Sequence, residues 1–351
     1  MSATGFTKRG WLLFGAMCLL WGVPYLLISV VVESFSPPAM VAGRTLIAAV
    51  LLLPFAIRSG ALKAAWKYWP WVLAFGLVEM AGPFFLLGHA EESLPSGLTG
   101  LLVATVPLFA ALIALGGGDR GVLRPARLIG LLVGFVGVGV VVAGPGLTGG
   151  KVDLFAAGEV LLVAVLYATA PFIVARKLDH VPSIGTITLA LLFIGILYLP
   201  IALLTQHAVP TVPSIAALIA LGVICTAIAF LVFFALIKEV GPVRAPLFTY
   251  VNPVIAIVLG GIVLAEPLTA GLLVGFPLVI IGCWFAGTGG RLRPKAVVDE
   301  TAVALTAEPV PPADPAKQPP AGRTPAERAP ERAGRAVPPE VRTSDGSPST
   351  E

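Results

Sequence analysis

The sequence predicts an all-α polytopic membrane protein with ten transmembrane helices, arranged as two inverted five-helix repeats. Three observations predict this fold class: the composition, ten apolar segments of membrane-spanning length, and landmarks that recur at a fixed offset. Hydrophobic residues make up 57% of the 351 residues and charged residues 12%, with a mean hydropathy of +0.95. A soluble domain needs far more polar surface, so most of the chain is expected to face lipid or other helices.

Ten segments have the length that a bilayer requires, because a hydrocarbon core roughly 30 Å thick takes about 20 apolar residues per helix. In chain order they cover approximately 11–32, 38–57, 68–90, 95–116, 125–144, 155–175, 183–204, 213–237, 242–264 and 268–288. Prolines mark several boundaries, since proline cannot donate the backbone hydrogen bond of a helix interior. Ala265-Glu266-Pro267 leaves only a tight turn before the last segment.

The basic residues set the orientation of these segments. Counted from a cytoplasmic N-terminus (residues 1–10), one side of the membrane carries fifteen lysines and arginines and the other carries only Lys151. This bias predicts a multi-pass protein of the bacterial-type plasma (inner) membrane with both termini cytoplasmic. Residues 289–351 are expected to form a disordered tail, because residues 296–351 hold 11 prolines and no aromatic residue and cannot bury enough apolar area to offset their ordering entropy.

The two halves of the apolar region echo each other in sequence. Three pairs of landmarks are 146 positions apart and a fourth is 141 apart: Trp21 and Tyr167, Pro54 and Pro200, Pro107 and Pro253, and the hexapeptide Gly-Leu-Leu-Val-Gly-Phe starting at Gly130 and at Gly271. We therefore assign 11–144 to a first repeat and 155–288 to a second. Five spans per repeat make the halves inverted, an arrangement with two near-equivalent packings that is typical of alternating-access carriers.

Several motifs agree with a known family. They are Leu20-Trp21-Gly22 with Pro24, the stretch 42–46, the stretch 95–100 leading to Pro107, and in the second half 235–245, 250–253 and Ala265-Glu266. Over residues 11–288 the chain resembles the EamA-type members of the drug/metabolite transporter superfamily. That family usually shows Gly-Glu where this chain has Ala265-Glu266. The resemblance implies a transporter in which helices 1–4 and 6–9 line the cavity and helices 5 and 10 pack at the edge. It names no single substrate, since relatives are associated with amino acids, other metabolites and toxic compounds.

Two ionisable residues lie inside apolar segments. Glu79 is eleven residues into the third segment, close to the midplane, where a charged carboxylate costs a few kcal/mol unless it is paired, protonated or hydrated. It is a candidate coupling or substrate-binding acid, with a structural acid as the alternative. Arg44 can extend toward the interface or turn inward and form an ion pair with Glu79. A structural clamp and an anion contact both fit Arg44.

Further candidates lie at the same depth. Pro107 and Pro253 stand in mid-helix, where a helix break exposes backbone dipoles at transporter binding sites, although a plain kink that helps packing explains them equally well. Aromatic faces, a hydroxyl and an amide near the midplane are typical of a pocket for small organic ligands. These groups belong to Trp21, Tyr167, Tyr250 and Asn252.

Other polar residues lie near segment ends. His89, Glu91, Glu92 and Glu159 are expected to be solvated interface residues, with a proton-linked outer gate as the alternative because histidine titrates near neutral pH. Glu266 is expected to cap the last helix. The three cysteines fall in apolar runs and are interpreted as small packing residues.

The sequence contains no motif for catalysis or nucleotide binding. It has neither a GxxxxGK[ST] phosphate loop nor HExxH, and only three histidines, so we expect no enzyme, cofactor, metal or nucleic-acid partner. The function that fits is a secondary transporter that exports a small metabolite or xenobiotic by alternating access, with membrane lipid around it and protons as a candidate coupling ion. An uncoupled facilitator or exchanger is the alternative, and a membrane-embedded enzyme or a sensor is the alternative from another class. The oligomeric state does not follow from the sequence.

Overall fold

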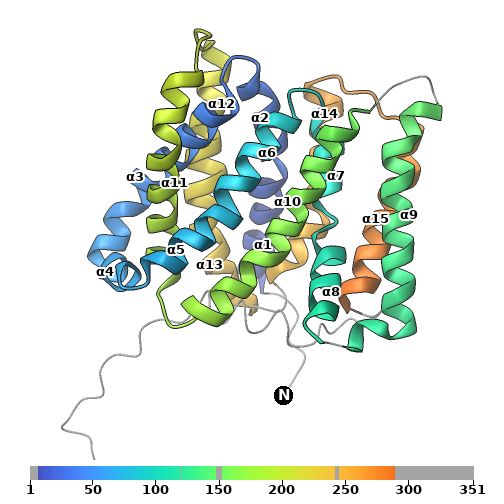
Figure 1. The fold of residues 1–351 in the computed structure, drawn as a ribbon, viewed down its shortest axis with the longest axis horizontal. Coiled ribbons are helices and arrows are strands. Elements are labelled where there is room, and N and C mark those ends of the chain that lie inside the picture. The colour runs from blue at the N-terminus through green and yellow to red at the C-terminus, as the bar shows by residue number, and fades with distance from the viewer. Residues whose placement is uncertain (1–6, 119, 148–151, 242–244, 289–351) are drawn as a thin grey trace, which may run out of the picture. The chain divides into compact units, whose positions relative to one another are not determined.

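The structure is a computed structural model that describes residues 7–118, 120–147, 152–241 and 245–288. The described residues are helical throughout apart from turns and short connections, as the sequence predicts (Figure 1). Within them, eight helical segments are long and apolar enough to cross a membrane, and two apolar helices, Asn252–Val263 and Ala270–Ala286, are shorter. The prediction of a ten-segment, all-helical membrane protein is confirmed. The expected disordered tail, 289–351, lies outside the described residues.

Each half contributes five spans in the same order, although some of the shorter elements differ between the halves. The first half contains α1 (Lys8–Gly22), α2 (Pro24–Val32), α3 (Pro37–Arg58), α4 (Ala61–Trp66), α5 (Trp69–Gly76), the π-helical turn η1 (Leu77–Ala81), α6 (Gly82–Ala90), α7 (Ser96–Val103), α8 (Val106–Gly116), the 3-10 turn η2 (Arg120–Leu123) and α9 (Pro125–Leu147). The second half contains α10 (Leu154–Ile173), the π-helical turn η3 (Val174–Leu178), α11 (Ser183–Thr205), α12 (Val212–Gly222), the π-helical turn η4 (Val223–Ile228), α13 (Ala229–Val240), the 3-10 helix η5 (Ala245–Tyr250), α14 (Asn252–Val263) and α15 (Ala270–Thr288).

The structure differs from the predicted segments in three places. The first span is divided at Val23, because Pro24 begins a new helix there. The short helix α4 was not expected between the second and third spans. The predicted span 242–264 is a 3-10 helix followed by α14, because Pro253 lacks the N–H that a continuous helix would need. At about 1.5 Å per residue, α14 alone is about 18 Å long.

The helix directions define two ends of the bundle. The end that carries Glu91 also carries the start of α10, since Ser93 Oγ lies 3.4 Å from Asp153 Oδ2. The other end carries Lys63 on α4 and the last turn of the sixth span. There Lys177 Nζ lies 4.7 Å from the Trp71 ring centroid. We call them the Glu91 end and the Lys63 end; they lie at the top and bottom of Figure 1. The first half begins at the Lys63 end and the second at the Glu91 end, so the two halves are inverted.

The internal repeat extends to irregular details of the backbone. The π-helical turn η1 in the third span begins at Leu77, and η4 in the eighth begins at Val223, 146 positions later. The break in the fourth span ends at Thr105 and the break in the ninth ends at Val251, again 146 positions apart. Glu79 and Cys225 therefore occupy equivalent places in the two π-helical turns. Because the same irregularities recur 146 positions apart in the two halves, they are part of the repeated fold and are not isolated distortions of single helices.

Helices α9 and α15, the last of each half, pack along each other through glycines. A Cβ built at Gly137 would lie 2.8 Å from the backbone nitrogen of Val279, and one at Gly130 would meet the backbone of α15 at Ala286. Small residues let apolar helices approach closely where burial against lipid gives no driving force. The repeated hexapeptide therefore lies in a close packing interface at one edge of the bundle (Figure 1).

Candidate functional site

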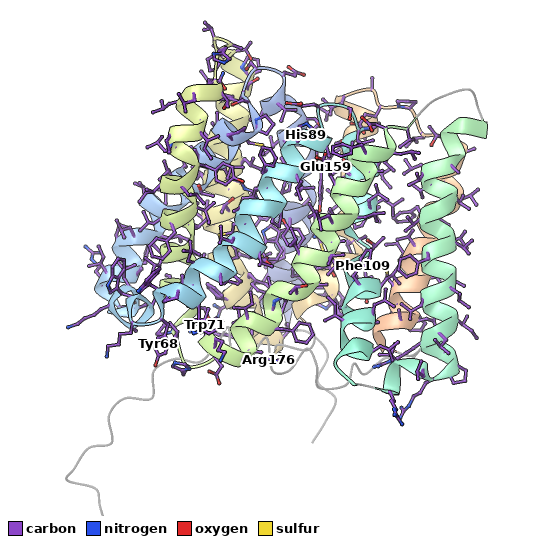
Figure 2. The ribbon with its side chains drawn as sticks, viewed as in Figure 1. Tyr68, Trp71, His89, Phe109, Glu159 and Arg176 are labelled. Carbon is purple, nitrogen blue, oxygen red and sulfur yellow. The ribbon has the colours of Figure 1, made fainter. Side chains whose placement is uncertain are left out.

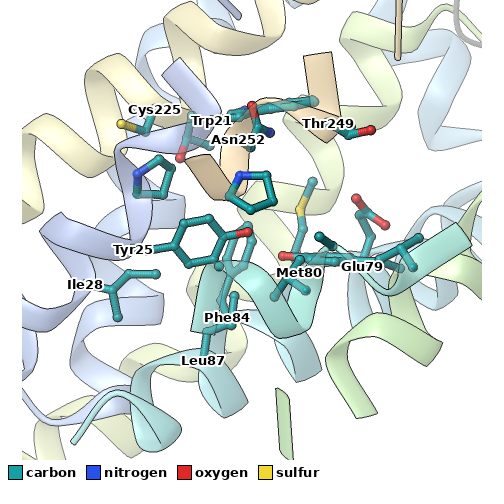
Figure 3. A pocket seen from close by; sticks show the side chains of 18 of the residues that line it. Trp21, Tyr25, Ile28, Glu79, Met80, Phe84, Leu87, Cys225, Thr249 and Asn252 are labelled. Carbon is teal, nitrogen blue, oxygen red and sulfur yellow. The ribbon is translucent and has the colours of Figure 1, made fainter. Parts of the chain in front are cut away.

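A central cavity of about 280 Å³ lies between the two halves. It is lined by all eight candidate site residues taken from the sequence: Trp21, Arg44, Glu79, Pro107, Tyr167, Tyr250, Asn252 and Pro253. Side chains from several helices surround it, as Figure 3 shows for a subset that includes Trp21, Tyr25 and Glu79. Lining residues come from seven of the ten spans. Helix α11 contributes none of them, contrary to the expectation for helix 7, while α9 and α15 stay at the edge.

The π-helical turns bring polar side chains to the cavity wall. A π-turn adds one residue to a helix and leaves irregular backbone bonding, and such turns are frequent at functional sites. Glu79 lies in η1, and Cys225 and Thr226 lie in η4. Thr226 Oγ1 donates to the carbonyl oxygen of Leu221 at 2.8 Å, and Tyr198 Oη donates to that of Ala81 at 3.0 Å. These bonds satisfy carbonyl groups at or beside the turns, so η1 is supported by a side chain of the other half and η4 by one of its own residues.

Arg44 lines the cavity without the acidic partner that the sequence suggested. Its Nε donates to Thr226 Oγ1 at 3.0 Å, and its Cζ lies 3.8 Å from the centroid of the Phe84 ring. The hypothesised Arg44–Glu79 ion pair is wrong for the described residues, because the guanidinium is fixed against Phe84 and Thr226 from other helices. Arg44 is only 6% exposed, so a cation is buried beside the cavity while Glu79 lies partly exposed along the same wall.

The two helix breaks both open on the cavity. Pro107 is the second residue of α8 and Pro253 the second residue of α14, so each proline begins a new helix after the break and does not merely kink a continuous one. The amino termini of both helices therefore point to the midplane, where their partial positive charge favours anionic groups. Asn252 Oδ1 is buried there without a hydrogen-bond partner among the described residues.

Aromatic rings make up much of the remaining wall. Trp21 packs edge-on to Phe230 with ring centroids 5.8 Å apart, and it also contacts Phe233 and Phe248 behind the wall. Tyr25, one turn further along the first span, is 9% exposed and lines the cavity beside Gly100. The cavity is therefore mostly apolar, with few polar groups at fixed positions, as in sites for small organic ligands.

Glu266 does not cap the last helix, as expected from its position, but the first residues of α7 in the other half. Its Oε1 accepts from the Ser96 N–H at 2.7 Å and its Oε2 from the Gly97 N–H at 3.1 Å. The turn that presents it includes Ala265 with a φ of 53°, in the left-handed region. Its position just before α15 in the sequence favoured a cap on that helix. The close packing of α14 on α7 instead brings the carboxylate to the start of α7.

Glu91 is also placed differently from the prediction, which made it a solvated interface residue. It is 6% exposed, and its Oε2 accepts from Ser29 Oγ at 2.7 Å. Its Oε1 is buried without a partner among the described residues. By contrast, Glu92 is exposed, as expected. His89 Nδ1 lies 2.8 Å from Glu159 Oε2, which connects the third span to the sixth (Figure 2).

Side-chain bonds join the two halves at the Glu91 end. Besides Glu266 and His89, Gln206 accepts from the Ser36 N–H at 2.8 Å, and Ser214 Oγ donates to the Val30 carbonyl at 2.7 Å. At the Lys63 end, the bonds described between the halves involve Glu239, which accepts from Thr7 Oγ1 at 2.6 Å and lies 3.9 Å from Arg9 Nε. More of the side-chain hydrogen bonds described between the halves therefore lie at the Glu91 end than at the Lys63 end.

Exposure of the cavity wall changes along its length. Ile28 and Leu87, which line it toward the Glu91 end, are 1% and 3% exposed. Thr249, which precedes the break in the ninth span on the side of the Lys63 end, is exposed. The cavity is thus closed by packed side chains toward the Glu91 end.

Sequence reasoning missed several lining residues, among them Tyr25, Phe84, Cys225 and Thr226. A signal for one of them was present, because Cys225 lies 146 positions after Glu79 and so had to share its depth and place. The other three belong to apolar or small-residue runs that give no sign of which helix face turns inward.

A model of the EamA-like transporter family matches the chain twice, at residues 8–143 and 154–288. The chain belongs to this family. The two matched stretches hold the two inverted halves, so EamA-like transporter describes the whole helical part of the molecule. It is a membrane transporter and not an enzyme.

Relatives of this EamA-like transporter include proteins from bacteria and archaea. The uncharacterized transporter YvbV of Bacillus subtilis (strain 168) is 29% identical over 82% of this chain and 94% of its own length. The uncharacterized inner membrane transporter YedA of Escherichia coli (strain K12) is 28% identical over 71% of this chain and 81% of its own length. A solved structure, described only as the crystal structure of a protein, has a TM-score of 0.56 and 23% identity over 79% of this chain and 96% of that one. It supports the fold alone.

Proposed function

We propose that this EamA-like transporter is a secondary carrier that exports a small metabolite or xenobiotic across the inner membrane by alternating access. The observation that carries the proposal is the central cavity, which lies between two inverted halves and is closed toward one end. Inverted halves have a second, near-equivalent packing in which the other end is closed. A solute bound at the midplane would then change sides without a continuous pore.

The basic residues support a cytoplasmic location for the Lys63 end, because that end carries Arg58, Lys63, Lys67, Arg176 and Lys177 and cytoplasmic loops are enriched in lysine and arginine. The Glu91 end then faces the outside. On this assignment the structure corresponds to the form that receives its solute from the cytoplasm, which is the loading form of an exporter.

The polar groups of the cavity restrict the chemistry of the solute. Arg44 and the amino termini of α8 and α14 favour an anionic or strongly accepting group at the midplane. The carbonyl oxygen Oδ1 of Asn252 requires a donor, and Glu79 requires a cation, a donor or a proton. A small amphipathic solute with an accepting group, a donor and an apolar body meets these requirements.

Glu79 is our candidate for proton coupling. Its carboxylate has no described hydrogen-bond or ion-pair partner, although it lines a cavity at midplane depth, where an isolated charge is costly. Binding either a proton or the donor group of the solute removes that cost, so the two compete for one carboxylate. Competition of this kind links solute export to proton import.

Two measurements test the proposal. A panel of metabolites and drugs is first scored for thermal stabilisation of the purified protein, because a ligand that binds the folded state raises its stability. Transport of the stabilising compound is then followed in proteoliposomes with an imposed pH gradient. Glu79→Gln is expected to lose the dependence on the gradient, whereas Glu92→Gln, which alters an exposed acid, is expected to keep it.

The outcomes separate coupling from transport itself. Gradient-driven transport that survives Glu79→Gln unchanged rules out Glu79 as the coupling acid and favours an uncoupled facilitator or exchanger. Purified protein that moves no compound of the panel but turns over a lipid-linked substrate would contradict the transporter assignment as a whole.

A further inference from the structure

Two carboxylates at the Glu91 end lie in opposite electrostatic environments. Glu266 accepts two backbone N–H groups at the amino terminus of α7, and such donors stabilise the charged form of a carboxylate. Glu91 receives one hydroxyl donor, from Ser29, and its second oxygen is buried without a partner among the described residues. Glu91 therefore lacks the backbone donors that Glu266 has, and a proton on its carboxylate would supply the missing donor.

The surroundings of Glu91 offer little compensation for a negative charge. Burial raises the pKa of Glu91 well above its ordinary value, and the negative charge of Glu266 adds to this effect. The hydroxyl of Ser29 and the more distant cation Arg44 act in the opposite direction. Tyr25 of α2 is the other titratable group that senses Glu91. Helices α7 and α14, which pack together at this end, carry no ionisable side chain.

The remaining charged or titratable groups described at this end are engaged elsewhere or exposed, and Glu33 and His207 are among the exposed ones. His89 and Glu159 pair with each other across the third and sixth spans. Glu92 is exposed, and Asp153 caps α10 by accepting from the backbone of Phe155 and Ala156.

We propose that Glu91 is a proton-binding site of the transporter, occupied when the Glu91 end is closed and emptied when that end opens. The proposal rests on the proposed function for its orientation, in which this end faces the outside. Opening exposes the carboxylate to water, where its ordinary acidity returns. Each opening at neutral pH then releases one proton outward, and each closing takes one up.

The sign of the pH dependence follows from the direction of the pKa shift. An acid whose pKa is higher in the closed form favours closure at low pH, and closure weakens as the pH rises from the ordinary value of a glutamate, about 4.3, toward the raised value. Between these two limits the ratio of open to closed molecules rises up to tenfold per pH unit. A site that bound a metal cation in place of a proton would follow the cation concentration at constant pH.

Cys225 supplies a native reporter for the experiment, because it lines the cavity while the other two cysteines do not. In a Cys18→Ala, Cys283→Ala background, a charged, membrane-impermeant methanethiosulfonate is applied to right-side-out and inside-out vesicles between pH 5 and 8. The labelling rate of each variant is divided by that of the parent at the same pH, so that the titration of the thiol itself cancels. Glu92→Gln is the matched control for Glu91→Gln.

With Glu91 as the proton site, labelling from outside in Glu91→Gln falls progressively below the parent as the pH rises, while Glu92→Gln gives a ratio near one throughout. Ser29→Ala removes the donor to Oε2 and is expected to move the opening profile to higher pH. A latch that is only structural would open more at every pH in that variant. Labelling from inside at low pH shows that each variant is folded.

Equal pH profiles for the parent and Glu91→Gln would overturn the assignment, as would opening that follows sodium concentration at constant pH. If raised pH instead promotes labelling from the side assigned to the cytoplasm, Glu91 remains the proton site and the orientation in the proposed function is wrong.

Discussion

Gly260 is the position at which one added methyl group is expected to loosen the closed end. It lies in the last turn of α14, and a Cβ built there would lie 2.7 Å from Ser96 Oγ and would collide with Glu266 Oε2. The carboxylate would have to move off α7 and give up the N–H groups of Ser96 and Gly97.

The magnitude follows from the bonds that are lost. Loss of a helix N-cap costs about 0.5–2 kcal/mol, and a hydrogen bond to a charged group contributes about 1.5–3 kcal/mol. We expect Gly260→Ala to lose about 2–3 kcal/mol by this route and to regain about 1 kcal/mol because alanine forms helix better than glycine. Gly261→Ala is the control, since the nearest atoms to a Cβ there are 3.9 and 4.0 Å away. The control keeps the gain and loses no bond.

The assay is thermal unfolding of the purified protein in detergent, with labelling of Cys225 from outside as a second readout. Gly260→Ala should unfold at a lower temperature than the parent and label faster, while Gly261→Ala should unfold at the same or a higher temperature. If the two variants unfold together, the contact between Glu266 and α7 does not hold this end closed.

Three further predictions use the same unfolding assay. Ala265→Val should cost at least about 1 kcal/mol because Ala265 has a left-handed backbone that β-branched residues strongly disfavour, and equal stability of Ala265→Gly and Ala265→Val would contradict this. Gly137→Ala should separate α9 from α15 and cost about 1–3 kcal/mol of stability. Gly139→Ala is the control and should cost none of this, because no atom lies within 4 Å of the added Cβ. Equal losses of stability in the two variants would refute the close-packing argument. Arg44→Lys should keep the fold but abolish thermal stabilisation by an anionic ligand. Lysine has no Nε–H that could bond Thr226 while a planar group of donors faces the ligand. Undiminished stabilisation by the ligand would show that Arg44 is not part of the binding site.

The sequence indicates how deep in the membrane a residue should lie, but it indicates poorly which side of its helix the residue is on. Depth follows from counting about 1.5 Å per residue, which is why Glu79, Tyr250 and Asn252 were expected near one level. All three line the cavity. Direction normally follows from an amphipathic pattern. In these helices the lipid-facing and the packed sides are both apolar, so the pattern is weak and Tyr25 and Phe84 gave no signal.

Tertiary neighbours explain the remaining differences. Glu91 was expected in solvent because it ends a helix beside Glu92, but the first span covers it and Ser29 contacts it. Glu266 reaches α7 because of how α14 packs on it, and Arg44 meets Phe84 and Thr226 because the halves enclose it. Each of these contacts joins residues far apart in the chain, and such pairings are decided by packing rather than by local sequence.

Glu79 and Cys225 occupy equivalent places in the repeat but differ in chemistry, so the two halves are less alike in these side chains than in their backbone. Turning an inverted repeat over in the membrane leaves the scaffold nearly unchanged, but it carries the acid from one π-helical turn to the place of a thiol. If Glu79 is the coupling acid, as proposed, this difference between the two turns biases transport in one direction. A chain with the two residues exchanged, Glu79→Cys with Cys225→Glu, would keep the composition and reverse that bias, so the direction of net flux could be read as a property of one carboxylate.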